Sequence, residues 1–224
     1  MGKVLKETHS YPAIDLSAHP LLLIGESERT QYLQKLHDGL GQMIAALNMQ
    51  LSAIRKSQPG NEALKQSMEL LKHMNKEYRD ICHYLLPPPP EYPGIEDAFR
   101  ILCNHVKNTA SCSIQFRNHN FAGALPPPTT IGVYRILQDL MSYIINRPGC
   151  SAVEASMWHQ EKQLYLSIRG DGSEELQTGQ PFRVTLPENL FVKTTLLGSR
   201  LHVDVIKPSY ANILLVIPCP RNEI

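Results

Sequence analysis

The chain of 224 residues is long enough for one large domain or two small ones, and its 42% hydrophobic content is sufficient for a buried core. A formal net charge of +1 gives no general attraction to nucleic acids or acidic membranes. The five cysteines are odd in number and form no CxxC pair, which argues against a disulfide framework or a zinc site and favours a reducing compartment.

The first 25 residues contain two prolines and no sustained apolar period, so residues 1–25 are predicted to be an N-terminal tail. Their longest apolar stretch, PLLLIG, is far too short to span a bilayer, and the N-terminus lacks the layout of a signal peptide. We therefore expect a cytoplasmic protein without membrane insertion.

Two long amphipathic helices are predicted within residues 26–86. Apolar residues of the first recur every seven positions, at Leu33, Leu40, Leu47 and Ile54. Pro59-Gly60 ends this helix, and the second runs until the four prolines at 87–90, which cannot continue it. A single antiparallel hairpin of this kind leaves too much apolar surface exposed, so we expect two copies to form a dimeric four-helix bundle.

After a proline-rich linker at residues 87–94, residues 95–224 mix helical and strand patterns. Helices are expected at 95–106 and 129–146, and strands at 113–117, 152–158, 164–169, 200–206 and 213–218. The second and third strands should form a hairpin, and the last two should pair. Helices mixed with antiparallel strands predict a two-layer α/β sandwich, which makes the whole chain α+β.

The first helix contains an unusual polar cluster, HDGLGQ, from His37 to Gln42. Each of its two glycines should cost the helix about 1 kcal/mol relative to alanine. Asp38 can hydrogen-bond one ring nitrogen of His37 and make the other a better nucleophile. On an α-helix Gly41 shares a face with His37, so we expect it to leave room for another molecule to approach the ring. The alternative is a solvated His-Asp pair on a helix that tolerates two glycines.

The stretch ERTQYLQKLHDGLGQMIAALNMQL resembles the dimerisation and phosphoacceptor helix of the sensor histidine kinases of the nitrate-sensor type. That family's pattern is an ER pair, then HD followed by three residues and Gln, and it matches Glu28-Arg29, His37, Asp38 and Gln42. The segments VYRILQDLMSYIINR, LYLSIRGDG and LLGSRLHVDV resemble motifs of the family's ATP-binding domain, so the resemblance covers residues 26–218. It implies that His37 is phosphorylated, that Asp38 is its general base or orienting group, and that Gln42 positions a water when the partner regulator is dephosphorylated.

The ATP-binding half departs from this family at the nucleotide-binding positions. The acidic residue of the first motif is present as Asp139, but Tyr143 stands where the family has a Mg²⁺-binding asparagine, and a phenol is a poor ligand for Mg²⁺. Gly170 replaces the aspartate that would bind the adenine amino group, and the remnant continues as Asp171 and Gly172; Asp171 could serve after a one-residue register shift. Two further motif positions differ, at Glu174 and at Ala211-Asn212. Joint loss at one site predicts that ATP chemistry is gone while histidine chemistry remains.

The sequence therefore predicts a bacterial phosphorelay protein in which His37 exchanges phosphate with a response-regulator aspartate without binding ATP. The chain itself is expected to hold no cofactor and no metal, because the receiver domain supplies Mg²⁺. Expected partners are a second copy, receiver domains and another histidine kinase, with no nucleic acid. Two alternatives stay open: an ATP-dependent sensor kinase with a divergent pocket, and a pseudokinase that docks a regulator or kinase without phosphotransfer. Enzymatic activity, as a phosphotransferase, kinase or regulator phosphatase, is thus left open.

Overall fold

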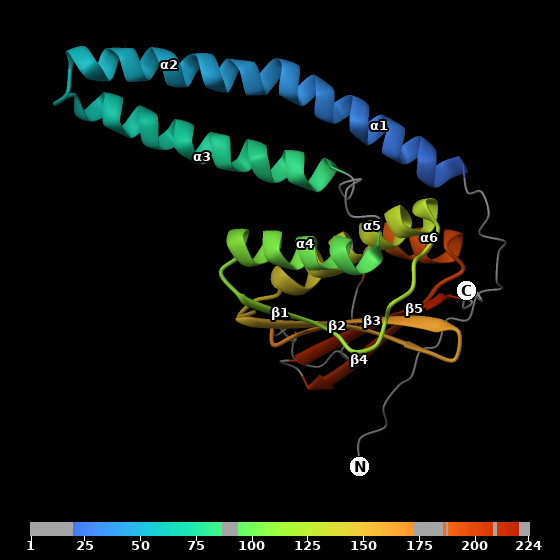
Figure 1. Ribbon diagram of the computed structural model, residues 1–224. Helices are drawn as coiled ribbons and strands as arrows, with labels where there is room; N and C mark the ends of the chain where they lie inside the picture. The colour runs from blue at the N-terminus through green and yellow to red at the C-terminus, as the bar shows by residue number, and fades with distance from the viewer. Residues whose placement is uncertain (1–19, 87–93, 173–185, 187, 208–209, 220–224) are drawn as a thin grey trace. The chain divides into compact units, whose positions relative to one another are not determined.

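The computed structural model describes residues 20–86, 94–172, 186, 188–207 and 210–219. These residues fall into two compact units, one within residues 20–86 and the other made of the described residues from 94 onward (Figure 1). The first unit is helical and the second combines helices with a sheet, so the predicted α+β class is confirmed. Three parts of the sequence analysis lie outside the described residues: the four prolines at 87–90, Glu174 and most of the predicted N-terminal tail.

The helical unit is an antiparallel hairpin. Its first arm is continuous through α1 (Pro20–Leu36), the π-helical turn η1 (His37–Gly41) and α2 (Gln42–Ser57), and its second arm is α3 (Glu62–Leu85). The first arm begins at Pro20, earlier than predicted, because a proline is well tolerated in the first turn of a helix. The Asn61 side chain caps α3 by accepting a hydrogen bond from the Leu64 amide at 3.1 Å.

Only part of the apolar surface of the hairpin is buried within one chain. Ile44, Leu64 and Leu71 are buried between the two arms. Other large apolar side chains of the same helices are exposed: Leu40, Met43, Leu47, Met49, Ile54, Leu70, Met74 and Ile81. An exposed apolar surface of this extent is typical of an interaction face, and the four-helix bundle stays a prediction.

The second unit is built on a five-stranded sheet with the order β1-β2-β3-β5-β4. Its strands are β1 (Ser113–Asn118), β2 (Ala152–Gln160), β3 (Gln163–Gly170), β4 (Arg200–Lys207) and β5 (Tyr210–Pro218). The β2–β3 hairpin and the β4–β5 pair are antiparallel, as predicted. However, β1 pairs with β2 in parallel, which requires a long crossover connection, and helix α5 lies in that connection.

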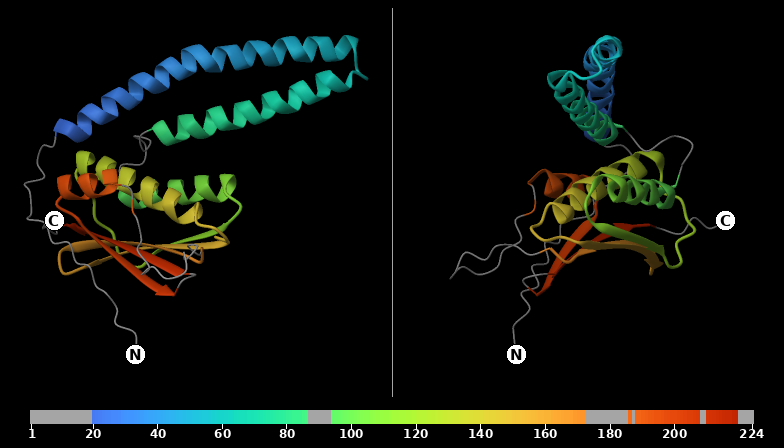
Figure 2. Two further views of the ribbon diagram at one scale, coloured as in Figure 1. Left: turned by 180° about the vertical axis from the view of Figure 1, so that it is seen from behind. Right: turned by 90° about the vertical axis from the view of Figure 1, so that its left-hand side faces the viewer.

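Three helices cover one face of this sheet: α4 (Ile95–Thr109), α5 (Pro127–Ile145) and α6 (Glu188–Leu196) (Figure 2). The core between the layers contains fully buried side chains from both, including Phe99, Ile136, Leu140, Leu166 and Ile168. The two-layer sandwich is therefore confirmed. Helix α6 was not predicted from the sequence. In the described part of the chain, no helix is long and apolar enough to cross a bilayer.

Candidate functional site

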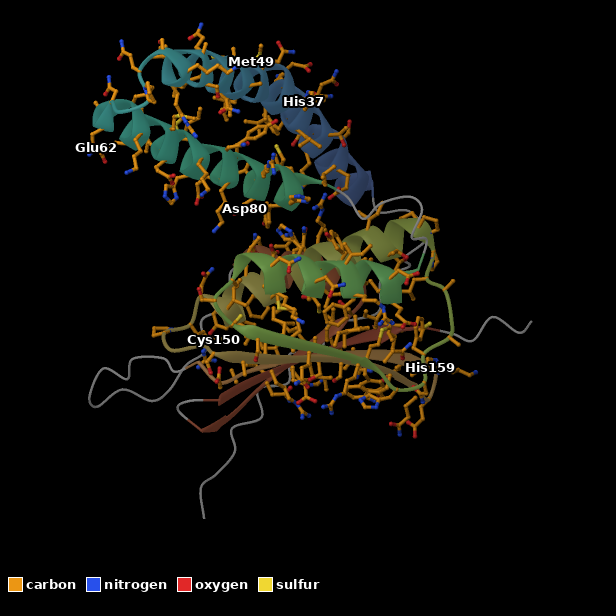
Figure 3. All side chains as sticks on the ribbon, turned by 60° about the vertical axis from the view of Figure 1, so that its left-hand side comes forward. His37, Met49, Glu62, Asp80, Cys150 and His159 are labelled. Carbon is orange, nitrogen blue, oxygen red and sulfur yellow. The ribbon has the colours of Figure 1, made fainter. Side chains whose placement is uncertain are left out.

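The His37–Asp38 pair lies where α1 passes into the π-helical turn. His37 Nδ1 is 3.3 Å from Asp38 Oδ1, and the two side chains are 74% and 58% exposed (Figure 3). When the carboxylate accepts a hydrogen bond from Nδ1–H, Nε2 carries the free lone pair of the imidazole. Because the ring is exposed, this geometry offers a nitrogen nucleophile to an approaching molecule.

The π-helical turn changes which residues accompany His37. A π turn contains one residue more than an α turn, and such turns are frequent at functional sites. Gln42 is five residues after His37, and on an α-helix the two side chains would be about 140° apart around the helix axis. The extra residue in the turn reduces this rotation, so we infer that Gln42 lies nearer to the His37 side than it would on an α-helix. Its side chain is exposed. The regular α-helix expected from the sequence would not have this relation.

Gly41 does not have the role expected from the sequence. A Cβ atom at Gly41 would lie 2.6 Å from Tyr78 Oη and 3.1 Å from Tyr78 Cζ, so the phenol of α3 fills the space above this glycine. In contrast, a Cβ atom added at Gly39 would have no neighbour within 4 Å. Gly41 therefore accommodates packing inside the hairpin, and the expectation that it opens access to the imidazole is wrong.

Tyr78 joins the site through this contact. A hydrogen bond with Cys82, together with burial, raises the pKa of Tyr78, and the negative charge of Asp38 raises it further. The phenol therefore stays protonated at neutral pH and lies within electrostatic reach of Asp38.

The nucleotide-motif positions of the second unit are engaged in internal contacts. Asp139 on α5 pairs with Lys193 on α6, with Oδ2 and Nζ 2.5 Å apart and with side chains only 8% and 17% exposed. This ion pair neutralises the carboxylate that the sequence marked as the acidic motif residue. Tyr143, one turn along α5, is half-buried.

Gly170 has no room for an additional side-chain atom unless its neighbours shift. The residue is buried near the end of β3, where a Cβ would collide with Ile144 of α5. The neighbouring strand places Ala211, which is fully buried, opposite Gly170. A carboxylate at this position would therefore require the Ile144 side chain to shift.

Asp171 is held by the backbone that opens β2. Its Oδ1 accepts hydrogen bonds from the amides of Ser151 and Ala152 at 2.8 and 2.9 Å, and its Oδ2 accepts one from the Ser151 hydroxyl at 2.5 Å. Burial favours the neutral acid, but these hydrogen bonds outweigh it and lower the pKa of Asp171 to about 2. These hydrogen bonds tie the carboxylate to the start of β2, so a ligand at Asp171 would have to share the carboxylate with them. Next to it, a Cβ at Gly172 would lie 2.6 Å from the Arg147 Cβ.

Comparison with known proteins locates the relatives of both units. Residues 28–90, which contain His37, Asp38 and Gln42, match the family described as histidine kinase. The signal transduction histidine-protein kinase/phosphatase UhpB of Salmonella typhimurium is 26% identical over 161 residues, covering 70% of this chain and 32% of UhpB. The sensor protein VraS of Staphylococcus epidermidis is 21% identical over 202 residues, covering 88% of this chain and 57% of VraS.

The sensor histidine kinase YxjM of Bacillus subtilis is 23% identical over 197 residues, covering 85% of this chain and 47% of YxjM. The chain thus spans between about a third and just over half the length of these relatives. Among solved structures, the Acinetobacter baumannii histidine kinase AdeS aligns with a TM-score of 0.44 and 12% identity, covering 81% of this chain and 97% of that one.

Proposed function

Because this chain belongs to the sensor histidine kinase family and to two-component signalling, we propose that its His37 accepts phosphate from a receiver-domain aspartate and passes it to another. The observation that carries this proposal is the exposed His37–Asp38 pair within the family-matched segment. The transfer needs no ATP from this chain, since an aspartyl phosphate and a phosphohistidine are comparably energetic.

The chemistry proposed for His37 is a displacement at phosphorus. The Nε2 lone pair attacks the phosphorus of the aspartyl phosphate, and the bond from phosphorus to the aspartate oxygen breaks as the N–P bond forms. The bonding electrons leave with the receiver carboxylate. Asp38 accepts a hydrogen bond from Nδ1–H and stabilises the positive charge that develops on the ring. The receiver supplies Mg²⁺, which neutralises the phosphoryl oxygens, and the reverse transfer follows the same path.

Gln42 has a separate proposed role in hydrolysis of the regulator phosphate. Its amide can donate and accept hydrogen bonds but cannot carry phosphate. The π-helical turn places it nearer to the side of His37 than an α-helix would, and its side chain is exposed. There the amide would orient a water for attack on the aspartyl phosphate of a bound receiver.

The proposal that Mg-ATP binds weakly or not at all is supported by the internal contacts of the second unit. Lys193 neutralises Asp139, the Ile144 side chain would have to shift to admit a carboxylate at Gly170, and Asp171 is held by β2. Mg²⁺ requires several oxygen ligands in near-octahedral geometry, and these side chains do not provide them. We therefore assign this chain no cofactor of its own.

An ATP-dependent kinase is the second candidate, and it is favoured by the names of the relatives, which are kinases. Titration calorimetry with Mg-ATP separates the two. We expect no saturable heat, whereas a dissociation constant of tens of micromolar or tighter, or labelling of His37 by radioactive ATP alone, would establish the kinase.

The phosphotransfer itself is tested with a phosphorylated receiver domain by following label on both proteins. His37→Ala should abolish transfer in both directions, while His73→Ala, at an exposed histidine on α3, should not. Gln42→Ala should leave transfer intact and slow the loss of phosphate from the regulator, with Gln34→Ala on the same arm as the control. If wild type binds receivers but is never labelled, the chain is a docking module.

The proposal also includes the assembly and the compartment. A homodimer formed through the exposed apolar surface of the hairpin would cover the side chains left open in one chain. We place the protein in the cytoplasm, where receiver domains are found and where its five free thiols would stay reduced.

A further inference from the structure

Arg147 is the polar group that neither the fold nor the proposed phosphotransfer explains. It lies in the turn that follows α5, and only 5% of its surface is exposed. All three guanidinium nitrogens are buried, and none has a hydrogen-bond partner among the groups that the structure describes. We propose that this guanidinium is the binding site for a small oxyanion, a ligand that carries a phosphate or carboxylate group.

The charge of Arg147 is what requires a ligand. A guanidinium has five N–H donors and does not lose its proton in proteins, so burial cannot neutralise it. A buried ion without a counter-charge costs several kcal/mol. An anion that satisfies the N–H groups removes this cost, whereas an uncharged ligand does not.

Two neighbouring carboxylates are engaged elsewhere. Asp171, next to the Gly172 that packs against the Arg147 side chain, uses both its oxygens at the start of β2. Asp139, on the helix that precedes Arg147, is paired with Lys193. The guanidinium is therefore left to a ligand from outside the described residues.

The position of Arg147 is fixed before a ligand arrives. Its amide donates to the Ile144 carbonyl at 3.2 Å, and its own carbonyl accepts from the Cys150 amide at 3.1 Å. Gly172 packs against its Cβ with no room for a side chain. Since the backbone on both sides is held, little ordering is lost when an anion binds. The planar fork of a guanidinium matches the paired oxygens of a carboxylate or phosphate, which defines the ligand class.

The test is thermal unfolding of the full chain at constant ionic strength, with chloride replaced stepwise by inorganic phosphate or by acetate. A ligand that binds only the native state raises Tm in a saturable manner. We expect such a rise for wild type, a smaller one for Arg147→Lys and none for Arg147→Met. Arg117→Met is the matched control, because Arg117 is 58% exposed and pairs with Glu154, so this variant should respond like wild type. Comparison of the two salts shows which oxyanion the site prefers.

A second measurement keeps the proposal testable if Arg147→Met does not fold. In wild type with ¹⁵N-labelled arginine, one Nε–H resonance should shift saturably on addition of phosphate or acetate and be missing from Arg147→Lys. Any one of three results would overturn the proposal. If neither anion moves that resonance, or if wild type and Arg147→Met gain equally in Tm, no oxyanion binds there. If Arg147→Met is destabilised equally in every salt and wild type shows no saturable response, a carboxylate of the chain itself serves the guanidinium.

Discussion

The two glycines of the π-helical turn differ in their surroundings, and alanine substitution should separate them. Gly41→Ala would place a methyl group 2.6 Å from Tyr78 Oη, whereas Gly39→Ala would meet nothing within 4 Å. Both substitutions gain about 1 kcal/mol of helix propensity. Because the glycines share one turn, this gain is common to both and cancels in the comparison.

The remaining difference is the cost of displacing the phenol. Inserting a methyl group into a packed contact typically costs about 1–3 kcal/mol. Gly39→Ala should therefore stabilise the hairpin by about 1 kcal/mol, and Gly41→Ala should leave it between neutral and about 2 kcal/mol less stable. Tyr78→Phe, which removes the hydroxyl nearest to the new methyl group, should recover part of the loss in the double variant.

The assay is urea unfolding at fixed protein concentration, followed by circular dichroism for the helices. Fluorescence of Trp158, the single tryptophan, reports the sheet-containing unit and should show the same midpoint in all variants. The reasoning is refuted if Gly41→Ala is as stable as Gly39→Ala, since the contact with Tyr78 would then have no cost.

Three further predictions follow from the charged and apolar groups. The pKa of Asp171 is about 2 in the folded protein, below its ordinary value of 3.8, so its contribution to the free energy of unfolding is complete above about pH 4 and is lost as the pH falls from about 4 to about 2. Asp171→Asn should lower stability at neutral pH and remove this part of the acid dependence. Acid unfolding that is unchanged in the variant would contradict this prediction. Lys193→Met should cost about 3 kcal/mol in urea unfolding because it removes the ion-pair partner of the buried Asp139 carboxylate. Lys193→Met combined with Asp139→Leu should be closer to wild type, and equal losses in the two variants would argue against the ion pair. Leu40→Glu should convert a dimer to a monomer in light scattering, since Leu40 belongs to the exposed apolar surface and the dimer would bury an unpaired charge there. If wild type is already monomeric at micromolar concentration, the four-helix bundle is refuted.

Most helices and strands of this protein could be predicted from its sequence because they depend on residues that are neighbours along the chain. Seven-residue apolar spacing, Pro59-Gly60 and the asparagine before α3 define the hairpin. Alternating apolar residues predicted the antiparallel strand pairs. His37 and Asp38 are adjacent, so their 3.3 Å contact also follows from local geometry. Their chemical role stays a prediction.

Tertiary packing decided the features that depend on residues far apart in the sequence. The contact with Tyr78 of α3 explains Gly41, and Leu197, which directly follows α6, packs against Gly132 of α5. Spacing along the chain could not show that Asp171 would be held by the start of β2, or that Arg147 would be buried. Periodicity records which face of an element is apolar, but the partner of a given side chain is set by the contacts and the burial that form only when distant elements pack together.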